Sequence, residues 1–313
     1  MPKVKTAGFF STAGSLPLPV GPRIAAGGYA IDFRVKATSP EWPPDWLLPR
    51  ERRLWVSIAQ WGLGCHERWL DGEGDQWLAA AVAAGDELTD AQDDRGGWVH
   101  AFRYPHSLPL GPPWYSAMAQ GEGASLLVRL HAATGHERWA EAGRAALDPM
   151  RRATADGGTQ AQLGGGPWPE EYPTQPGSYV LNGGLFAMWG VRDVAVGLGD
   201  AQAAGEFEDY AQTLGREIGR WDTGRWSRYD LFPHPAPNVA SSFYHALHVE
   251  QLRAATILRP DPRVDAVRER FEAYAASAGH RRLAFAQKSL FRLVVPRNKV
   301  LAHRLPWTRR LGR

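Results

Sequence analysis

The stretch Ser57-Ile58-Ala59-Gln60 recurs 60 residues further along the chain as Ala117-Met118-Ala119-Gln120. The stretch from Trp77 to Leu88 likewise recurs from Trp139 to Met150, 62 residues on. Self-similarity with a fixed period of this size is typical of repeat architectures, in which every repeat is one supersecondary unit. Each unit is long enough for two helices, so the sequence predicts a series of helical hairpins.

The same register extends further along the chain. A glycine turn follows the second helix of three units, at Gly96, Gly157 and Gly224. The equivalent positions on four first helices are then Gln60, Gln120, Asn182 and His245. Because a hairpin cannot bury its apolar stripe alone, the hairpins are expected to stack and curl into an all-α fold, an α/α toroid with the first helices inside.

Changes in composition divide the chain into three parts. Residues 1–49 form a Gly- and Pro-rich N-terminal extension, in which the alternation from Tyr29 to Val35 predicts a β-strand. Residues 50–280 are expected to form the toroid. Residues 281–313 hold ten Lys or Arg and no Asp or Glu, although the whole chain carries a net charge of only +3.

Apolar residues are interspersed with the charges of segment 281–313. We expect a basic amphipathic tail that lies on an anionic membrane surface or grips an acidic polymer, with a solvated terminal arm as the alternative. A nucleic-acid partner is not expected, because no recognised binding motif accompanies the charge.

The single cysteine, Cys65, cannot form an internal disulfide and is expected in the core. The N-terminus lacks the apolar run of a signal peptide, and no stretch of about 20 apolar residues occurs. We therefore expect a cytoplasmic protein, which the basic tail could bring to the inner face of the membrane.

Familiar cofactor and nucleophile motifs are absent from the sequence. No GxGxxG follows a strand, neither GxxxxGK[ST] nor GxSxG occurs, and Gly164-Gly165-Gly166-Pro167 is expected to be a flexible loop. His245 and His248 are three residues apart, but no third ligand stands at a recognisable spacing. We therefore predict neither a metal nor another cofactor.

Three long segments, residues 93–116, 156–180 and 222–244, lead back from a second helix to the next first helix. In a toroid they emerge at one end. They are rich in Tyr, His and acidic residues, so we expect the active site there. The fourteen tryptophans are explained either by core packing or by stacking on sugar rings.

Two features of these segments suit acid–base chemistry. Glu170 and Glu171 are adjacent carboxylates between prolines. The tyrosines beside Arg228 and His245 are expected to have lowered pKa values, because positive neighbours favour the phenolate.

Several runs, in this order along residues 42 to 255, resemble the C-terminal domain of D-glucuronyl C5-epimerases, which convert D-glucuronate into L-iduronate within heparan-type polymers. The runs are Ile58-Ala59-Gln60-Trp61-Gly62-Leu63, Trp114-Tyr115-Ser116-Ala117-Met118-Ala119-Gln120, Glu170-Glu171-Tyr172-Pro173-Thr174, Val180-Leu181-Asn182-Gly183 and Ser227-Arg228-Tyr229-Asp230-Leu231. The resemblance implies an α/α barrel with a tyrosine-rich cleft for a uronic acid chain, and it is compatible with a homodimer.

By motif, the resemblance implies catalytic roles for Glu171, Tyr172, Tyr229 and Tyr244. The expected substrate-binding residues are Trp114, Tyr115, Gln120, Glu170, Asn182, Arg228, His234 and His245. One departure concerns the carboxylate-binding arginine, because the family has Arg-His after Tyr-Asp-Leu, whereas this chain has Phe232-Pro233-His234. Arg228 or Arg103 is the expected replacement, and the identity of the substrate is open.

Epimerisation at carbon 5 requires a base, a proton donor on the opposite face of the sugar and a clamp for the carboxylate. Glu171 or Tyr172 would serve one face and Tyr229 or Tyr244 the other, with Arg228, His234 or His245 holding the carboxylate. Three alternatives remain open at this stage: a polysaccharide lyase, which shares the proton abstraction, a glycoside hydrolase on the same toroid, and a non-catalytic polysaccharide-binding module.

Overall fold

The computed structural model describes residues 27–42, 49–104 and 106–297. Four helical hairpins follow one another along the chain. They consist of α2 (Trp55–Leu70) with α3 (Asp75–Ala91), α4 (Ala117–Thr134) with α5 (Glu137–Ala145), α7 (Leu181–Gly197) with α8 (Ala201–Glu217), and α9 (Ser242–Leu258) with α10 (Pro262–Ala276). The short helix α6 (Asp148–Arg151) and the final helix α11 (Ala278–Val294) complete the set. The four predicted hairpins are therefore confirmed.

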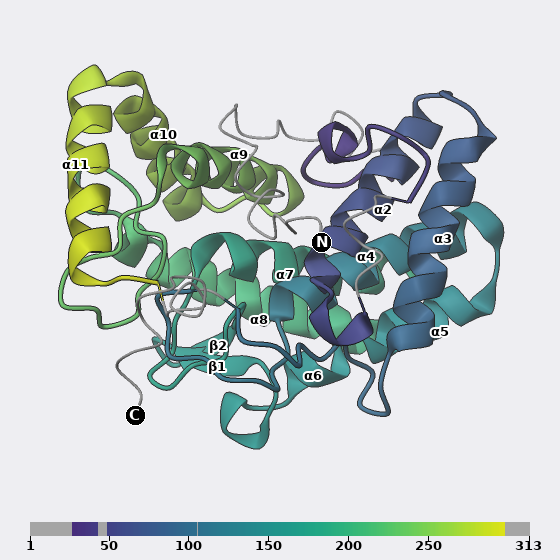
Figure 1. Cartoon of the computed structure of the whole chain (residues 1–313). Helices are drawn as coiled ribbons and strands as arrows, with labels where there is room; N and C mark the ends of the chain where they lie inside the picture. Colours follow the sequence, from purple (N-terminus) through teal and green to yellow (C-terminus); the bar gives the residue numbers. More distant parts are fainter. Residues whose placement is uncertain (1–26, 43–48, 105, 298–313) are drawn as a thin grey trace, which may run out of the picture.

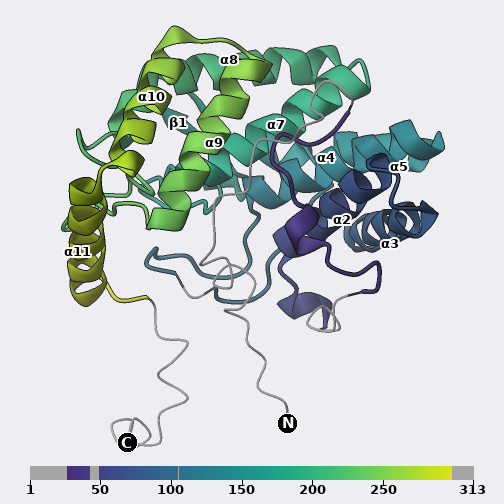
Figure 2. The ribbon, with the colours of Figure 1, turned by 90° about the horizontal axis from the view of Figure 1, so that it is seen from above.

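The first helices of the hairpins form the inner layer. Helix α2 packs on α4, α4 on α7 and α7 on α9, and Figure 2 shows these four helices in a curved row with the second helices outside. Two glycines allow α4 and α7 to approach closely, because a Cβ at Gly121 or Gly190 would overlap the backbone of the facing helix. This arrangement is the predicted α/α toroid, and each predicted equivalent position lies on an inner helix.

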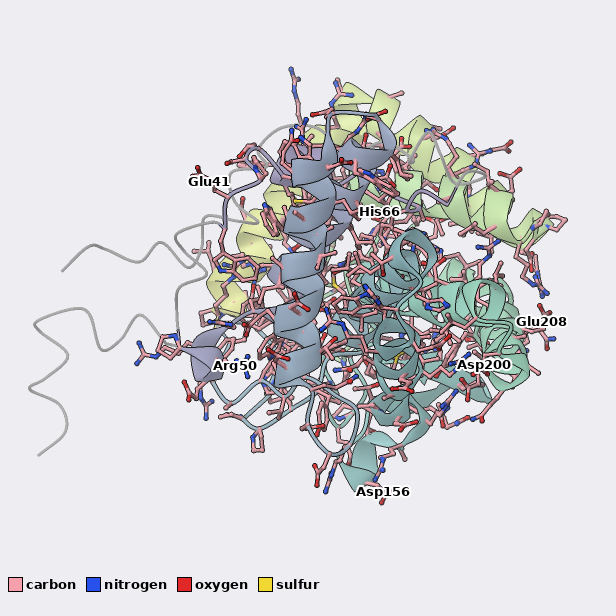
Figure 3. All side chains as sticks on the ribbon, turned by 90° about the vertical axis from the view of Figure 1, so that its right-hand side faces the viewer. Glu41, Arg50, His66, Asp156, Asp200 and Glu208 are labelled. Carbon is pink, nitrogen blue, oxygen red and sulfur yellow. The ribbon has the colours of Figure 1, made fainter. Side chains whose placement is uncertain are left out.

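The outer helices are amphipathic and present their charged faces to solvent. In Figure 3, Asp200 and Glu208 of the third hairpin lie at the edge of the molecule. Asp200 Oδ1 accepts a hydrogen bond of 2.9 Å from Ala203 N and so caps the start of α8. Glu208 forms an ion pair with Arg259 at the end of α9.

The strand predicted from Tyr29 to Val35 is not formed. An irregular segment leads into a 3₁₀ turn, Arg34–Lys36, and its aromatic side chains enter the core, where Tyr29 stacks on Phe33 at 5.6 Å. Arg129 of α4 holds the segment by donating to Gly28 O at 2.9 Å. The apolar residues are therefore spaced for contacts with the inner helices, and not for pairing with another strand.

A β-hairpin lies between the second and third helical hairpins, where no strand was predicted. Strands β1 (Gln160–Leu163) and β2 (Gly166–Pro169) are antiparallel and are joined by Gly164 and Gly165, whose φ angles are +57° and +79°. Positive φ at both central residues is what a type I′ turn requires. The expected flexible loop is therefore a tight hairpin turn, and the strand after it leads directly into Glu170 and Glu171.

Helix α11 stands beside α9 and α10 at one end of the row (Figure 1). It begins at Ala278, so the division predicted after residue 280 falls inside this helix, and residues 298–313 of the predicted tail lie outside the described residues. In the described part of the chain, every helix is too short or too polar to cross a bilayer. The membrane contact of segment 281–313 stays a prediction.

Candidate active site

Aromatic side chains from all three predicted loop segments meet at one place. The ring centroids of Tyr104 and Tyr172 are 6.1 Å apart, and the His106 ring lies 4.6 Å from Tyr172 and 5.8 Å from Tyr229. Tyr244, in the first turn of α9, packs edge-on against Tyr229 at 4.9 Å. The loops therefore converge as predicted, and we call Tyr104, Tyr172, Tyr229 and Tyr244 the tyrosine cluster.

Glu171 lies beside this cluster at the start of α7. Its carboxylate lies directly over Gly183, where a Cβ atom would overlap Oε2, so only glycine leaves room for it. Burial raises the pKa of Glu171 to about 8, partly offset by a hydrogen bond from the Tyr172 hydroxyl. Oε2 has no hydrogen-bond partner among the described residues. Glu171 is thus a buried carboxyl group that titrates near neutral pH.

The phenol groups have the opposite pKa shift from the one that the sequence predicted. Burial raises the pKa of Tyr172 and of Tyr229, and the nearby Glu171 carboxylate raises both further. The pKa of Tyr244 is also raised, chiefly by burial. The prediction of lowered values was wrong because desolvation and neighbouring acidic groups outweigh any positive neighbour. The tyrosines are therefore protonated around neutral pH.

Glu170 faces its own loop. It is fully buried, and its carboxylate accepts hydrogen bonds from Ser178 Oγ at 2.6 Å and from Tyr179 N at 3.0 and 3.1 Å. Tyr179 has a φ of +48°, a conformation that costs a tyrosine energy and persists only when its surroundings enforce it. Both carboxylate oxygens of Glu170 therefore accept hydrogen bonds within the loop that carries Glu171 and Tyr172, and its contact with substrate stays a prediction.

Two hydrogen bonds place Tyr229 in the cluster. Its N–H donates to Asn238 O at 2.7 Å, and its carbonyl accepts from Leu181 N at 3.2 Å. The adjacent Arg228 pairs as an isolated antiparallel bridge with Val239. The Arg228 side chain is half-buried, and its Nε is buried without a hydrogen-bond partner among the described residues. Arg103, the other expected replacement for the clamp arginine, is exposed.

The other predicted substrate contacts divide into two groups. Trp114 lies 5.6 Å from the Tyr172 ring, and Asn182 has a buried Oδ1 with no partner among the described residues, next to Gly183 under Glu171. Both therefore stay candidates for substrate contact. His234 Nε2 lies 3.5 Å from Asp230 Oδ2, and its contact with substrate also stays a prediction.

The second group is engaged by the protein itself. Tyr115 donates its hydroxyl to Asp93, and the Gln120 amide lies within hydrogen-bonding distance of Trp98 N and Ala146 O. His245 is fully buried, with Nδ1 against Ser227 and Nε2 3.0 Å from Phe271 O. The predicted substrate contacts of Tyr115, Gln120 and His245 are therefore not supported, because packing between the helices uses their polar atoms.

Sequence reasoning did not assign four further residues around the cluster. Tyr104 and His106 lie in segment 93–116, in which the active site was expected because the segment is rich in Tyr and His. Their residue types were the sequence feature that could have identified them. Lys288 and Arg292 belong to α11, and the Lys288 ammonium lies 5.6 Å from the centre of the Tyr229 ring. A group of three or more His, Cys, Asp or Glu side chains suited to a metal ion is not found among residues 27–42, 49–104 and 106–297.

Comparisons with known proteins agree with the resemblance of the motifs. The family model of the D-glucuronyl C5-epimerase C-terminus matches residues 92–273. A D-glucuronyl C5-epimerase of Caenorhabditis elegans is 33% identical over 220 residues, which cover 64% of this chain and 36% of that protein. An uncharacterized protein of Methanocaldococcus jannaschii is 24% identical over 178 residues, which cover 55% of this chain and 56% of that protein.

The chain thus spans only about a third to a little over half of the length of these relatives. Among solved structures, the unsaturated glucuronyl hydrolase of Bacillus sp. GL1 aligns with a TM-score of 0.45 at 18% identity, over 73% of this chain and 61% of that chain. That similarity is too low to bear on function. The family match, in contrast, covers more than half of the sequence and includes the whole tyrosine cluster, and the chain therefore belongs to the family of the D-glucuronyl C5-epimerase C-terminal domain.

Proposed function

We propose that this chain is a uronyl 5-epimerase, which interconverts D-glucuronate and L-iduronate residues within an acidic polysaccharide. The observation that carries the proposal is the meeting of Glu171 with the tyrosine cluster in one buried place, in a chain of this family. An enzyme that inverts a carbon centre needs two proton-transferring groups on opposite faces of that carbon.

The chemistry explains why such groups must be buried. The hydrogen on carbon 5 is adjacent to a carboxylate and is very weakly acidic, so its removal requires a strong base and stabilisation of the enediolate that forms. A water-excluded site strengthens every electrostatic interaction with that developing charge. The base takes the proton from one face, and an acid returns a proton to carbon 5 from the other face, so the net reaction consumes nothing.

Among the candidate groups, Glu171 is the best suited to act as the base. Its pKa of about 8 lies near a working pH, where the ionised form is accessible and still basic. The phenols, whose pKa values are raised, remain protonated and can donate to the enediolate. We therefore assign Glu171, with its partner Tyr172, to one face of the sugar and the pair Tyr229 and Tyr244 to the other.

The alternatives predict different products. A glycoside hydrolase would need a pair of acting carboxylates, but Glu170 is committed to Ser178 and Tyr179 within the protein. A lyase would use the same proton abstraction and then expel the substituent at carbon 4. A binding module would retain the polymer without any exchange.

The test is incubation with polymers that contain glucuronate in heavy water, followed by NMR at carbon 5. We expect deuterium at carbon 5 and the appearance of iduronate signals without chain cleavage. Ultraviolet-absorbing unsaturated ends would instead identify a lyase, and new reducing ends a hydrolase. Calorimetric binding with no deuterium uptake would contradict the epimerase and support the binding module.

A further inference from the structure

One face of helix α11 combines two buried apolar side chains with two half-buried cations. Ala284, Lys288, Phe291 and Arg292 follow the spacing of one helical face, and this face is turned toward the body of the protein. The opposite face exposes large apolar side chains, namely Phe285, Leu290, Leu293 and Val294. Placing cations inward costs free energy unless they meet a partner. We therefore ask what Lys288 and Arg292 bind on the inward face of the helix.

Lys288 reaches the turn that carries Tyr229. Its ammonium group donates to Asn238 Oδ1 at 2.6 Å and to Val239 O at 2.8 Å, and Asn238 in turn donates to Asp230 Oδ2 at 2.6 Å. Both acceptors of Lys288 are uncharged, and a lysine has three N–H donors. Burial lowers the pKa of Lys288 to about 7, and the charges of Arg292 and Arg297 lower it further against the opposing effect of Asp230.

Arg292, one turn further along α11, has a hydrogen-bond donor without an acceptor among the described residues. Its Nη1 is buried and has no hydrogen-bond partner in the part of the chain that the structure describes. The guanidinium interacts electrostatically with Tyr229, Asp230 and Tyr244, which places it at the same side of the tyrosine cluster as Lys288. Burial lowers the pKa of His106, which contacts Tyr172 and Tyr229, and the charges of Arg292, Arg297 and Lys288 lower it further. A guanidinium in this state presents a donor fork suited to a carboxylate.

We propose that Lys288 and Arg292 of α11 form the clamp for the carboxylate of the uronate whose carbon 5 faces Glu171 and Tyr229. This inference rests on the proposed function, which requires a cationic clamp beside the base. Arg103 is exposed, whereas Lys288 and Arg292 both interact with Tyr229, so α11 supplies cations at the tyrosine cluster itself. Helix α11 begins at Ala278, beyond the family match that ends at residue 273. The clamp is therefore an element of this chain outside the matched domain.

The test uses Arg292→Gln, with Arg292→Lys as the conservative variant and Arg282→Gln on the exposed side of α11 as the matched control. The probes are an unsulfated polymer of alternating D-glucuronate and N-acetylglucosamine and the same polymer with its carboxyl groups reduced to alcohols. We measure affinity by calorimetry, KM and kcat by deuterium exchange at carbon 5, and thermal unfolding to confirm that each variant folds.

We expect Arg292→Gln to weaken binding of the carboxylate polymer about 10- to 100-fold, the range for a hydrogen bond to a charged group. The variant and the wild type should bind the carboxyl-reduced polymer with the same affinity. Arg292→Lys should recover part of the loss, and Arg282→Gln should behave as the wild type. Unchanged carboxylate binding in Arg292→Gln, or an equal loss for both polymers, would overturn the clamp.

The two proposals fail in different ways. If the wild type exchanges deuterium and Arg292→Gln matches it in KM and kcat, the clamp is wrong and the epimerase stands. If the wild type binds the carboxylate polymer through Arg292 without exchanging deuterium, the clamp stands and the epimerase is wrong. Wild-type protein that neither binds nor exchanges would refute both.

Discussion

The candidate site has two sides that burial affects in opposite directions. On one side, Glu171 and the tyrosine cluster have raised pKa values, so their neutral, protonated forms are favoured. On the other side, Lys288 and Arg292 have lowered pKa values, so their charges are disfavoured. Both shifts have desolvation as their largest cause. An anionic sugar would add a counter-charge to the cationic side, where Asp230 already acts on both Lys288 and Arg292.

The largest expected effect is on the acid–base side. Replacing Glu171 by Gln or Tyr229 by Phe should reduce the rate of deuterium exchange at carbon 5 by about 10²- to 10⁴-fold, the usual contribution of a general acid or base. Tyr172→Phe should act similarly. Tyr210→Phe is a matched control, because Tyr210 is equally buried but lies on the outer helix α8 and donates to Met150 O.

Polymer affinity should fall much less than the exchange rate in these variants, since they remove transition-state interactions and leave the cationic side intact. Exchange within about threefold of the wild type in both Glu171→Gln and Tyr229→Phe would place the chemistry elsewhere.

The acid–base side was largely predictable from the sequence, and the cationic side was not. Glu171, Tyr172 and Tyr229 stand in local runs dense in chemical groups, and the helical repeat shows that their segments emerge at one end. The charges of Lys288 and Arg292 are scattered among Leu and Phe residues, a pattern typical of a membrane-surface helix. Only the packing of α11 shows that Lys288 and Arg292 share the inward face with Ala284 and Phe291, while most of its large apolar residues are exposed.

The same distinction explains the smaller errors. Glu170 and Glu171 are identical neighbours in the sequence. The carboxylate of Glu170 accepts hydrogen bonds from Ser178 and Tyr179, whereas the carboxylate of Glu171 lies over Gly183. Likewise, the pKa values of the phenols depend on desolvation, and the residues next to each tyrosine in the sequence do not reveal how deeply it is buried. Residue types were therefore readable from the sequence, whereas the partner of each polar atom required the tertiary structure.

A substitution at Gly183 tests how precisely Glu171 must be held. In Gly183→Ala, the added methyl group would overlap Glu171 Oε2 and displace the carboxylate. We expect exchange to fall about 100-fold, the effect of misplacing a catalytic group by roughly 1 Å. Gly205→Ala is the control, since a Cβ there meets no atom within 4 Å. A Gly183→Ala enzyme with normal exchange and a folded circular dichroism spectrum would contradict the placement of Glu171 as base.

The pH dependence of exchange compares the two sides directly. Glu171 must lose its proton to act, and its pKa is about 8. Lys288 must keep its proton to attract the carboxylate, and its pKa is about 7, with Asp230, Arg292 and Arg297 as the charged groups around it. Because the base has the higher pKa, kcat/KM should rise up to about pH 7, stay level to about pH 8 and fall above that, with limbs of about tenfold per pH unit.

Bound carboxylate should raise the pKa of Lys288, because an opposite charge favours its protonated form. The alkaline limb should therefore move to higher pH in the profile of kcat, which reports the enzyme–substrate complex. Lys288→Gln should lack this limb altogether. An alkaline limb that persists unchanged in Lys288→Gln would show that another group produces it.

The smallest effect concerns stability, and it separates the burial of Glu171 from its catalytic role. The folded pKa of Glu171 is about 8, above the usual value of 4.5, so folding takes up a proton between these pH values. The stability that the protonated carboxyl group contributes is fully present below pH 4.5 and is lost as pH rises through 8. Glu171→Gln has no such titration. At pH 9 its free energy of unfolding should exceed that of the wild type by about 1–3 kcal/mol, so it should unfold at a higher temperature. At pH 4 the two proteins should unfold at the same temperature.

Glu208→Gln provides the control of opposite sign, because the ion pair with Arg259 lowers the pKa of Glu208 and its contribution is lost toward acid pH. A stabilisation by Glu171→Gln that is equal at pH 4 and pH 9 would mean that the charge of Glu171 is not what destabilises the acid–base side.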